Sequence, residues 1–151
     1  MLLTRPGRIA ADTDGALVVD PSRVLGDAAS LWHPNMGLGQ VSGESMRLVW
    51  PTGVFFWLGD AVGLPAWAVQ RLWLGALLML AAAGVLFVFR TFRWTLLPAV
   101  AAAGAYALSP FVVAAGVVDS ARMVPMAALP WLLALAVRAT RSRGWRHPAS
   151  L

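Results

Sequence analysis

The chain has 151 residues, of which 59% are hydrophobic and only 13% are charged, and its mean hydropathy is +0.69. Soluble domains carry about 25% charged residues, so this composition excludes an ordinary soluble domain and indicates a membrane protein. The absence of cysteine excludes a disulfide framework and a cysteine-ligated metal site.

The formal charge of +5 comes entirely from arginine and is unevenly distributed. Residues 1–71 hold five arginines against six acids, a net charge of −1. The other basic positions lie between apolar segments or after the last one: Arg90, Arg93, Arg122, Arg138, Arg141, Arg143 and Arg146. Two segments are rich in arginine: the one with Arg90 and Arg93, and the one from Arg138 to Arg146. Since cytoplasmic loops are enriched in basic residues, these two segments should face the cytoplasm and residues 1–71 should face outward. We expect no nucleic-acid partner.

The region 1–71 begins with an acidic stretch, Ala-Asp-Thr-Asp-Gly, at positions 11–15. An EF-hand calcium loop with Gly15 at its sixth position would place Ala10 first and Pro21 twelfth, so that motif is excluded. Two interpretations of Asp12 and Asp14 stay open: a plain turn, or functional carboxylates. Because no signal peptide is evident, we expect a further transmembrane helix ahead of residue 1.

Asp20 followed by Pro21 predicts a helix start, because Asp caps helices and proline suits the first helical position. Apolar residues then recur at helical spacing as far as Trp32, which predicts an amphipathic helix at the membrane surface, stopped by Pro34. Residues 35–45 predict a loop. Residues 50–64 are apolar but interrupted by proline and glycine, which predicts a re-entrant or interfacial segment.

Three apolar segments follow, and we predict transmembrane helices at about 66–89, 94–109 and 119–137. Pro110 should end the second, and Trp67 and Trp73 suit an outer aromatic belt around the first. Small residues in the second segment predict close packing against further helices. Residues 138–151 predict a basic cytoplasmic tail. The expected fold is an all-α membrane protein in which residues 1–71 form an outer loop carrying short interfacial helices.

The polar residues suggest the class of chemistry. No ionisable residue lies inside the three expected spans, which disfavours a transporter. Carboxylates and arginines gather instead in the outward-facing region. A carboxylate can deprotonate an acceptor hydroxyl and a guanidinium can hold a departing phosphate, which favours an enzyme acting on a lipid-linked substrate. Arg71, one turn into the first span, is either a snorkelling interfacial residue or a phosphate contact.

Several short motifs occur in a specific order, and together they resemble the N-terminal membrane domain of bacterial alpha-1,3-arabinofuranosyltransferases. The resemblance covers about residues 8 to 138. The motifs are Ala11-Asp12-Thr13, Leu17-Val18-Val19-Asp20-Pro21, Leu31-Trp32 with Pro34, Gly39-Gln40-Val41, Trp50-Pro51, Phe55-Phe56, Leu58-Gly59, Gly63-Leu64-Pro65, Val69-Gln70-Arg71-Leu72-Trp73, Ala105-Tyr106-Ala107-Leu108-Ser109-Pro110 and Ala128-Leu129-Pro130-Trp131.

The resemblance implies a polytopic GT-C helical bundle in the plasma membrane, with its active site on the outer face. It implies decaprenylphosphoryl-arabinose as donor, arabinan as acceptor, and the remaining helices of a longer enzyme as partners. Asp12 matches the family's catalytic aspartate, whereas Asp14 stands where the family has lysine. The candidate substrate-binding residues are Asp14, Gln40, Arg47 and Arg71. No metal ligand is assigned and no cofactor is certain. The alternatives are a non-catalytic remnant or assembly module and, less favoured, a transporter subunit.

Overall fold

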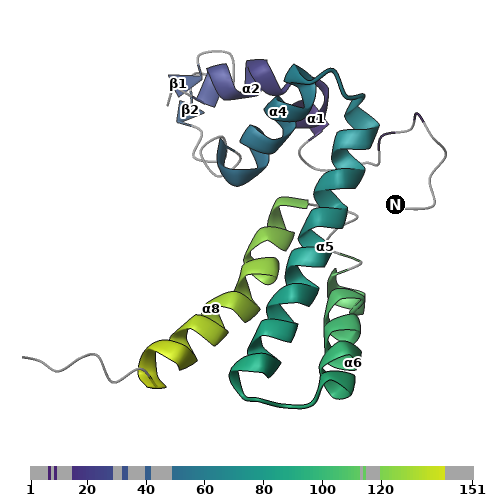
Figure 1. Ribbon diagram of the computed structural model, residues 1–151. Coiled ribbons are helices and arrows are strands. Elements are labelled where there is room, and N and C mark those ends of the chain that lie inside the picture. The colour runs from purple at the N-terminus through teal and green to yellow at the C-terminus, as the bar shows by residue number, and fades with distance from the viewer. Residues whose placement is uncertain are drawn as a thin grey trace, which may run out of the picture. The chain divides into compact units, whose positions relative to one another are not determined.

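The computed structural model describes residues 7, 9, 15–28, 32–33, 40–41, 49–112, 114 and 120–141 (Figure 1). These residues are mainly helical and form two compact units. The first unit comprises Met1–Ala76 with Ala114–Arg122, and the second comprises Leu77–Val113 with Met123–Leu151. In chain order the elements are α1 (Gly15–Val19), α2 (Pro21–Ala28), β1 (Trp32–His33), β2 (Gln40–Val41), η1 (Val49–Gly53), α4 (Val54–Ala61), α5 (Ala66–Thr91), α6 (Leu96–Ala107), η2 (Ser120–Arg122) and α8 (Met123–Arg141).

Helix α2 begins where Asp20 and Pro21 predicted it. The Asp20 carboxylate accepts a hydrogen bond of 3.0 Å from the backbone N–H of Arg23, as an N-cap does. Val24 and Leu25 are half-buried, whereas Arg23 and Asp27 are exposed. The predicted division of this helix into an apolar and a polar face is therefore confirmed.

The predicted length of that helix is wrong. Helix α2 ends at Ala28, and Trp32–His33 is instead a short strand. It pairs antiparallel with Gln40–Val41, so the predicted loop is also wrong at those two positions. Residues 34–39 include proline, asparagine and two glycines, which favour a chain reversal, and β-pairing across such a turn outweighs the helical spacing of Trp32.

Helix α4 packs closely against the start of α5. A Cβ atom on Gly59 would lie 2.6 Å from Cγ2 of Val69, so only glycine permits this approach. Gly63, with φ +78°, then turns the chain towards α5, which begins directly after Pro65 as predicted. At eight residues, or about 12 Å, α4 is too short to cross a bilayer core of about 30 Å.

An aromatic cluster lies between α4 and α5 and corrects one prediction. Trp73 is only 6% exposed, so it is a core residue rather than part of an aromatic belt. Its ring centroid lies 5.0 Å from that of Phe55 and 6.4 Å from that of Phe56. Trp73 follows Val69 by four residues and therefore shares the buried face of α5. Trp67, which lies off that face, is half-buried.

Two helices are long and apolar enough to cross a membrane. Helix α5 has 26 residues and α8 has 19, which correspond to about 39 Å and 28 Å. Helix α6 has 12 residues, or about 18 Å, and is the shorter apolar helix of the second unit. Large apolar side chains on all three remain exposed, for example Met79, Leu97 and Leu132. Three membrane crossings stay a prediction.

The second span was predicted to end at Pro110, and the break occurs slightly earlier. Helix α6 ends at Ala107, and Pro110 opens a new helical turn. The Ser109 hydroxyl accepts a hydrogen bond of 3.4 Å from the backbone N–H of Val112. Ser109 and Pro110 thus act as a helix start, which is where proline is tolerated best.

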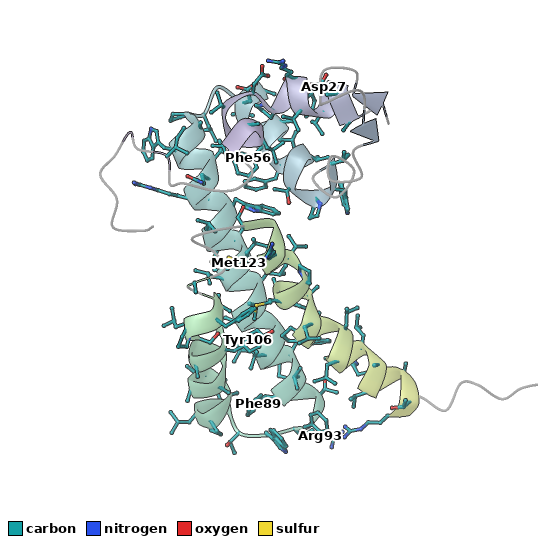
Figure 2. All side chains as sticks on the ribbon, turned by 180° about the vertical axis from the view of Figure 1, so that it is seen from behind. Asp27, Phe56, Phe89, Arg93, Tyr106 and Met123 are labelled. Atoms are coloured by element: carbon teal, nitrogen blue, oxygen red, sulfur yellow. The ribbon has the colours of Figure 1, made fainter. Side chains whose placement is uncertain are left out.

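A proline inside α8 shapes the second unit. Pro130 has no backbone N–H, so the carbonyl of Met126 loses its helical partner. The hydroxyl of Tyr106, on α6, donates to that carbonyl at 2.9 Å (Tyr106 is labelled in Figure 2). The next residue, Trp131, donates from Nε1 to the carbonyl of Leu80 on α5 at 2.9 Å. Side chains thereby join α8 to both neighbouring helices.

Close approach in this unit also depends on small residues. Ala99, Ala103 and Ala107 form the buried face of α6, at a spacing of four residues. Gly84 of α5 is buried under α8, where an added Cβ would lie 2.7 Å from Cδ1 and Nε1 of Trp131. Small residues of α6 and α5 are therefore buried within the unit, and packing of α6 against further helices stays a prediction.

We expect Tyr106→Phe to lower the free energy of unfolding by about 1–3 kcal/mol, because it leaves the part-buried Met126 carbonyl without a donor. Pro130→Ala restores a backbone N–H for that carbonyl, so Tyr106→Phe should cost much less in that background. Thermal unfolding of the detergent-extracted protein, measured for both single variants and the double variant, checks this. Additive effects of the two substitutions would show that the hydroxyl is not replacing the missing amide.

We expect Gly84→Ala to destabilise the protein by about 1–3 kcal/mol, because the new methyl group collides with Trp131. The matched control is Gly75→Ala on the same helix, where an added Cβ has no neighbour within 4 Å. That control should stabilise by about 0.5–1 kcal/mol, since alanine favours helix. The same unfolding measurement compares the two, and equal effects would refute the predicted close contact.

Candidate functional site

The predicted site residues are unequally placed by the structure. Asp12, Asp14 and Arg47 lie outside the described residues. Gln40 is described through its backbone, in β2 opposite His33. Arg71 is the predicted site residue whose side chain is described. The predicted convergence of these five residues therefore stays a prediction, and the described elements next to them in the sequence define the candidate site.

The acidic stretch immediately precedes α1, whose first residue is Gly15. Helix α1 is well anchored, with Leu17 only 1% and Val18 only 4% exposed. A small cavity of about 40 Å³ lies between α1, α4 and the start of α5, large enough for ordered water. Its lining residues are Val18, Val19, Pro21, Phe56, Asp60, Leu64, Ala66 and Val69. The element that follows Asp14 is thus packed against the first turn of an apolar helix.

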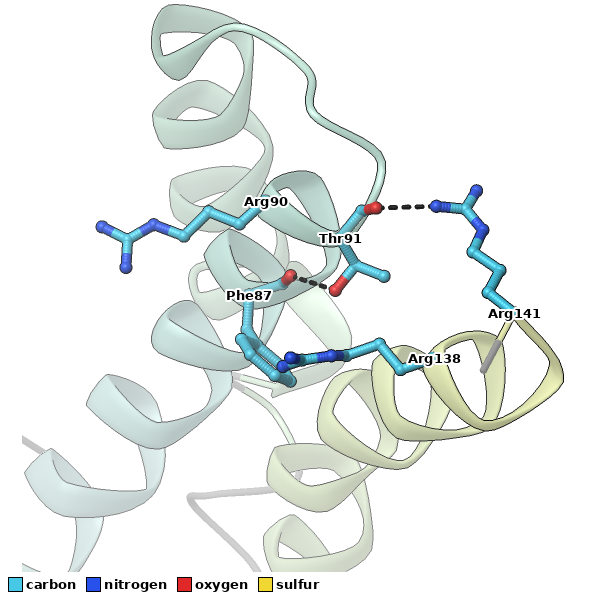
Figure 3. Close-up of a pocket in the computed structure, with 5 residues that line it drawn as sticks. All are labelled: Phe87, Arg90, Thr91, Arg138 and Arg141. Carbon is cyan, nitrogen blue, oxygen red and sulfur yellow. Dashed lines mark hydrogen bonds between the residues drawn. The ribbon is translucent and has the colours of Figure 1, made fainter. Parts of the chain in front are cut away.

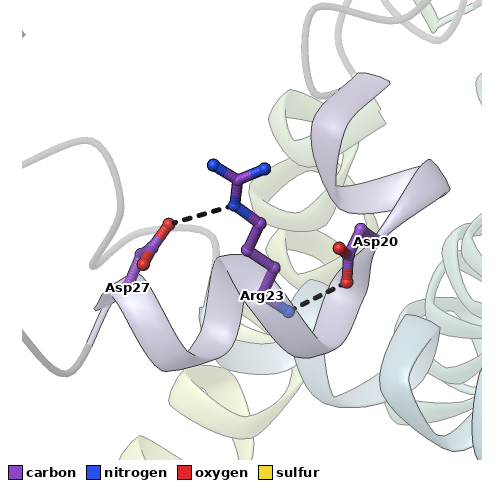
Figure 4. A network of polar contacts seen from close by, with 3 residues as sticks. All are labelled: Asp20, Arg23 and Asp27. Carbon is purple, nitrogen blue, oxygen red and sulfur yellow. Dashed lines mark hydrogen bonds and ion pairs between the residues drawn. The ribbon is translucent and has the colours of Figure 1, made fainter. Parts of the chain in front are cut away.

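A second hollow, of about 410 Å³, lies along the outer surface of α1 and α2. It is lined by the polar network of Asp20, Arg23 and Asp27, drawn in Figure 4. The Nε of Arg23 lies 3.9 Å from Oδ2 of Asp27, and both side chains are mostly exposed. Such a pair contributes about 0–1 kcal/mol. Asp20 caps α2, Arg23 and Asp27 form an exposed ion pair on its surface, and we assign these side chains no catalytic role.

Arg71 lies near the start of α5 and is half-buried. Its Cζ atom is 4.9 Å from the ring centroid of Trp67, a cation–π contact that orients the guanidinium. A stacked guanidinium presents its N–H groups at its edge, in the geometry suited to bidentate phosphate binding. The same contact would also stabilise a snorkelling residue, so both interpretations of Arg71 stay open.

Sequence reasoning missed a basic cavity in the second unit. Its volume is about 380 Å³, and its lining residues are Phe87, Arg90, Thr91, Arg138 and Arg141 (Figure 3). The arginines were interpreted only as a topology signal. The last turns of α5 and α8 carry these residues at helical spacing, but their convergence depends on which helix ends lie together. Across the described part of the chain, no three His, Asp or Glu residues could hold a metal ion.

Comparison with known proteins identifies the family. The model of the family described as "Alpha-(1->3)-arabinofuranosyltransferase, N-terminal GT-C domain" matches residues 1–151. A curated alpha-(1->3)-arabinofuranosyltransferase of Mycolicibacterium smegmatis is 36% identical over 139 residues, which cover 91% of this chain. The protein of that name from Mycobacterium tuberculosis is 34% identical over 149 residues, or 96% of this chain. The chain spans about a tenth of their length, 10% and 11%.

Solved structures agree. The cryo-EM structure of the arabinofuranosyltransferase AftD from Mycobacteria matches with a TM-score of 0.83 and 32% identity, covering 89% of this chain and 10% of that one. A mutant of that enzyme matches with a TM-score of 0.82 and 33% identity, over 87% of this chain and 11% of the other. These matches confirm the predicted GT-C-type helical membrane fold. The chain belongs to the family of N-terminal GT-C domains of alpha-(1->3)-arabinofuranosyltransferases.

Proposed function

We propose that this chain forms part of a membrane glycosyltransferase that transfers arabinofuranose from decaprenylphosphoryl-arabinose to cell-envelope arabinan. The observation that carries the proposal is the match of the family model to residues 1–151, supported by the TM-score of 0.83 to the solved enzyme. The protein would lie in the plasma membrane as a multi-pass protein, with the transfer on its outer face.

In this proposal Asp12 is the general base. An acceptor hydroxyl is a poor nucleophile at neutral pH, and a carboxylate that removes its proton during attack on the anomeric carbon accelerates an inverting displacement. Asp12 lies three residues before Gly15, where α1 begins. Leu17 and Val18 of α1 are buried, and Val18 lines a small cavity together with residues of α4 and α5.

Donor binding falls to the arginines and polar residues of the same unit. Decaprenyl phosphate leaves as an anion, so a guanidinium beside it stabilises the developing charge. Arg71 suits this role because α5 brings it to the start of an apolar helix, where a lipid-linked phosphate would lie, and Trp67 orients it. Arg47, Gln40 and Asp14 complete the proposed substrate site.

We expect Asp12→Asn to lower transfer by about 10²–10⁴-fold while donor binding survives, because the substitution keeps the shape and removes the basicity. The assay is transfer of labelled arabinose from the decaprenyl-phosphate donor to an oligoarabinoside acceptor, using membranes that contain the protein. Asp27→Asn is the matched control, since it makes the same charge change on the exposed surface of α2.

The alternatives give different results in this assay. Undiminished transfer by Asp12→Asn would remove Asp12 from the mechanism. Equal losses for Asp12→Asn and Asp14→Asn, mimicked by chelation, would indicate a metal held by both carboxylates. An unmodified protein that binds donor but transfers nothing would favour the non-catalytic module, for which the aspartate at position 14 is the motivating observation.

The proposed orientation makes a separate prediction. Cysteines introduced singly at Ser42 and Ser142 report the two sides of the membrane against a chain that has no cysteine of its own. We expect a membrane-impermeant thiol reagent to label position 42 and not position 142 in intact cells, because the +4 segment 138–146 should stay in the cytoplasm. The reverse labelling pattern would place the acidic stretch on the wrong side for the proposed transfer.

A further inference from the structure

The second unit has a charge imbalance that its own residues cannot offset. Its sequence contains six arginines (Arg90, Arg93, Arg138, Arg141, Arg143 and Arg146) and no aspartate or glutamate. All seven acids of the chain lie in the sequence of the first unit. No acidic side chain of the second unit can therefore pair with its arginines.

Two of these guanidinium groups are held in place at one cavity (Figure 3). Arg141 donates from NH1 to the carbonyl of Thr91, at the last residue of α5, over 2.8 Å. Its Cζ lies 4.8 Å from the ring centroid of Phe92. Arg138, one helical turn earlier on α8, places its Cζ 5.3 Å from the ring centroid of Phe87. Both guanidinium groups are thus oriented by aromatic faces and lie on the same side of α8.

Arg138 and Arg141 both line the cavity, and each guanidinium stacks on an aromatic ring. Ring stacking uses the face of a guanidinium, whereas its five N–H donors lie at the edge. The bond to Thr91 uses one donor of Arg141. Like charges one helical turn apart repel each other, and an anion between them removes that cost. Favourable interaction with the C-terminal end of α8 explains basic residues in its last turn, but it does not require two of them to converge on α5.

We propose that this cavity binds the phosphate of an anionic membrane lipid headgroup. The cavity of about 380 Å³ could hold a volume equal to about a dozen waters, which is room for a phosphate group. It opens at the ends of two helices that are long and apolar enough to cross a membrane, so it lies where headgroups would lie. Basic cavities between transmembrane helices are sites at which anionic lipid headgroups bind. Exposed apolar side chains on the same helices, such as Leu132 and Leu135, would contact the acyl chains.

Arg90 and Arg93 lie near the same end of α5 and show how binding at the cavity can be told apart from a general effect of positive charge. Arg90 also lines the cavity, but Figure 3 shows its side chain extending from α5 away from Arg141. Arg93 lies beyond the end of α5, is exposed, and does not line the cavity. Arg93 therefore offers a matched substitution that removes one positive charge at the same end of the unit without changing the site.

The test uses the whole protein that carries this chain, extracted in non-ionic detergent and titrated with phosphatidylglycerol or phosphatidylcholine. Native mass spectrometry measures the lipid retained. We expect preferential retention of phosphatidylglycerol and a loss of affinity of about five-fold for Arg138→Gln or Arg141→Gln, and about 25-fold for both together. Arg93→Gln should change retention by less than about two-fold, since it lies outside the cavity.

The other outcomes overturn the proposal. Equal retention of the two lipids would exclude recognition of anionic lipid. An equal loss for Arg93→Gln would show a general charge effect. Displacement of phosphatidylglycerol by the same concentration of inorganic phosphate would assign the cavity to the free anion. Arg138→Gln is the variant least expected to disturb folding, because the described contact of Arg138 is its stacking on Phe87. If this variant keeps both its unfolding temperature and its retention of phosphatidylglycerol, the proposed site is refuted.

Discussion

The hydrogen bond from the Tyr106 hydroxyl to the Met126 carbonyl is the interaction on which the second unit depends. A part-buried backbone carbonyl without a donor costs about 1–3 kcal/mol, and Pro130 removes the donor that α8 would supply. A side chain of another helix supplies the missing donor. Because the repair comes from α6, the proline that weakens α8 also specifies which neighbour it packs against. The Trp131 bond to Leu80 and the Arg141 bond to Thr91 tie the same helix to α5 in the same way.

This constraint explains why the short motifs of the sequence belong together. Tyr106 and the Pro130-Trp131 pair lie in different motifs, and they are partners in one hydrogen-bonded arrangement. In the first unit, Phe55 and Phe56 of one motif pack on Trp73 of another, while Gly59 permits the contact with Val69. In each of these contacts the two partners come from different motifs. A sequence that resembles the family at all of them therefore contains both partners of each contact, whereas a single motif contains only one.

Local rules predicted the features that local interactions decide. Asp20 and Pro21 predicted the start of α2, and long segments without charged residues predicted α5 from about residue 66 and the other apolar helices. The wrong predictions concern residues whose structure depends on contacts with residues elsewhere in the sequence. Trp32 has helical spacing but pairs with Val41, and Trp73 looks like a belt residue until α4 covers it. For the site, composition could indicate carboxylate chemistry, but the role of Asp12 came from the resemblance. The arginine cavity could not be predicted, because residues about fifty positions apart have to converge.

The division of charge between the two units connects these observations. The first unit holds all seven acids with six arginines in its sequence, and the second holds six arginines and no acid. Proton transfer by a carboxylate is therefore possible only in the first unit, where the proposed base Asp12 lies. The arginine side chains of the second unit carry hydrogen-bond donors and no acceptor, so they suit the binding of an anion. The first unit therefore carries the groups suited to the proposed chemistry on a lipid-linked sugar, and the second unit carries groups suited to holding a lipid phosphate in place.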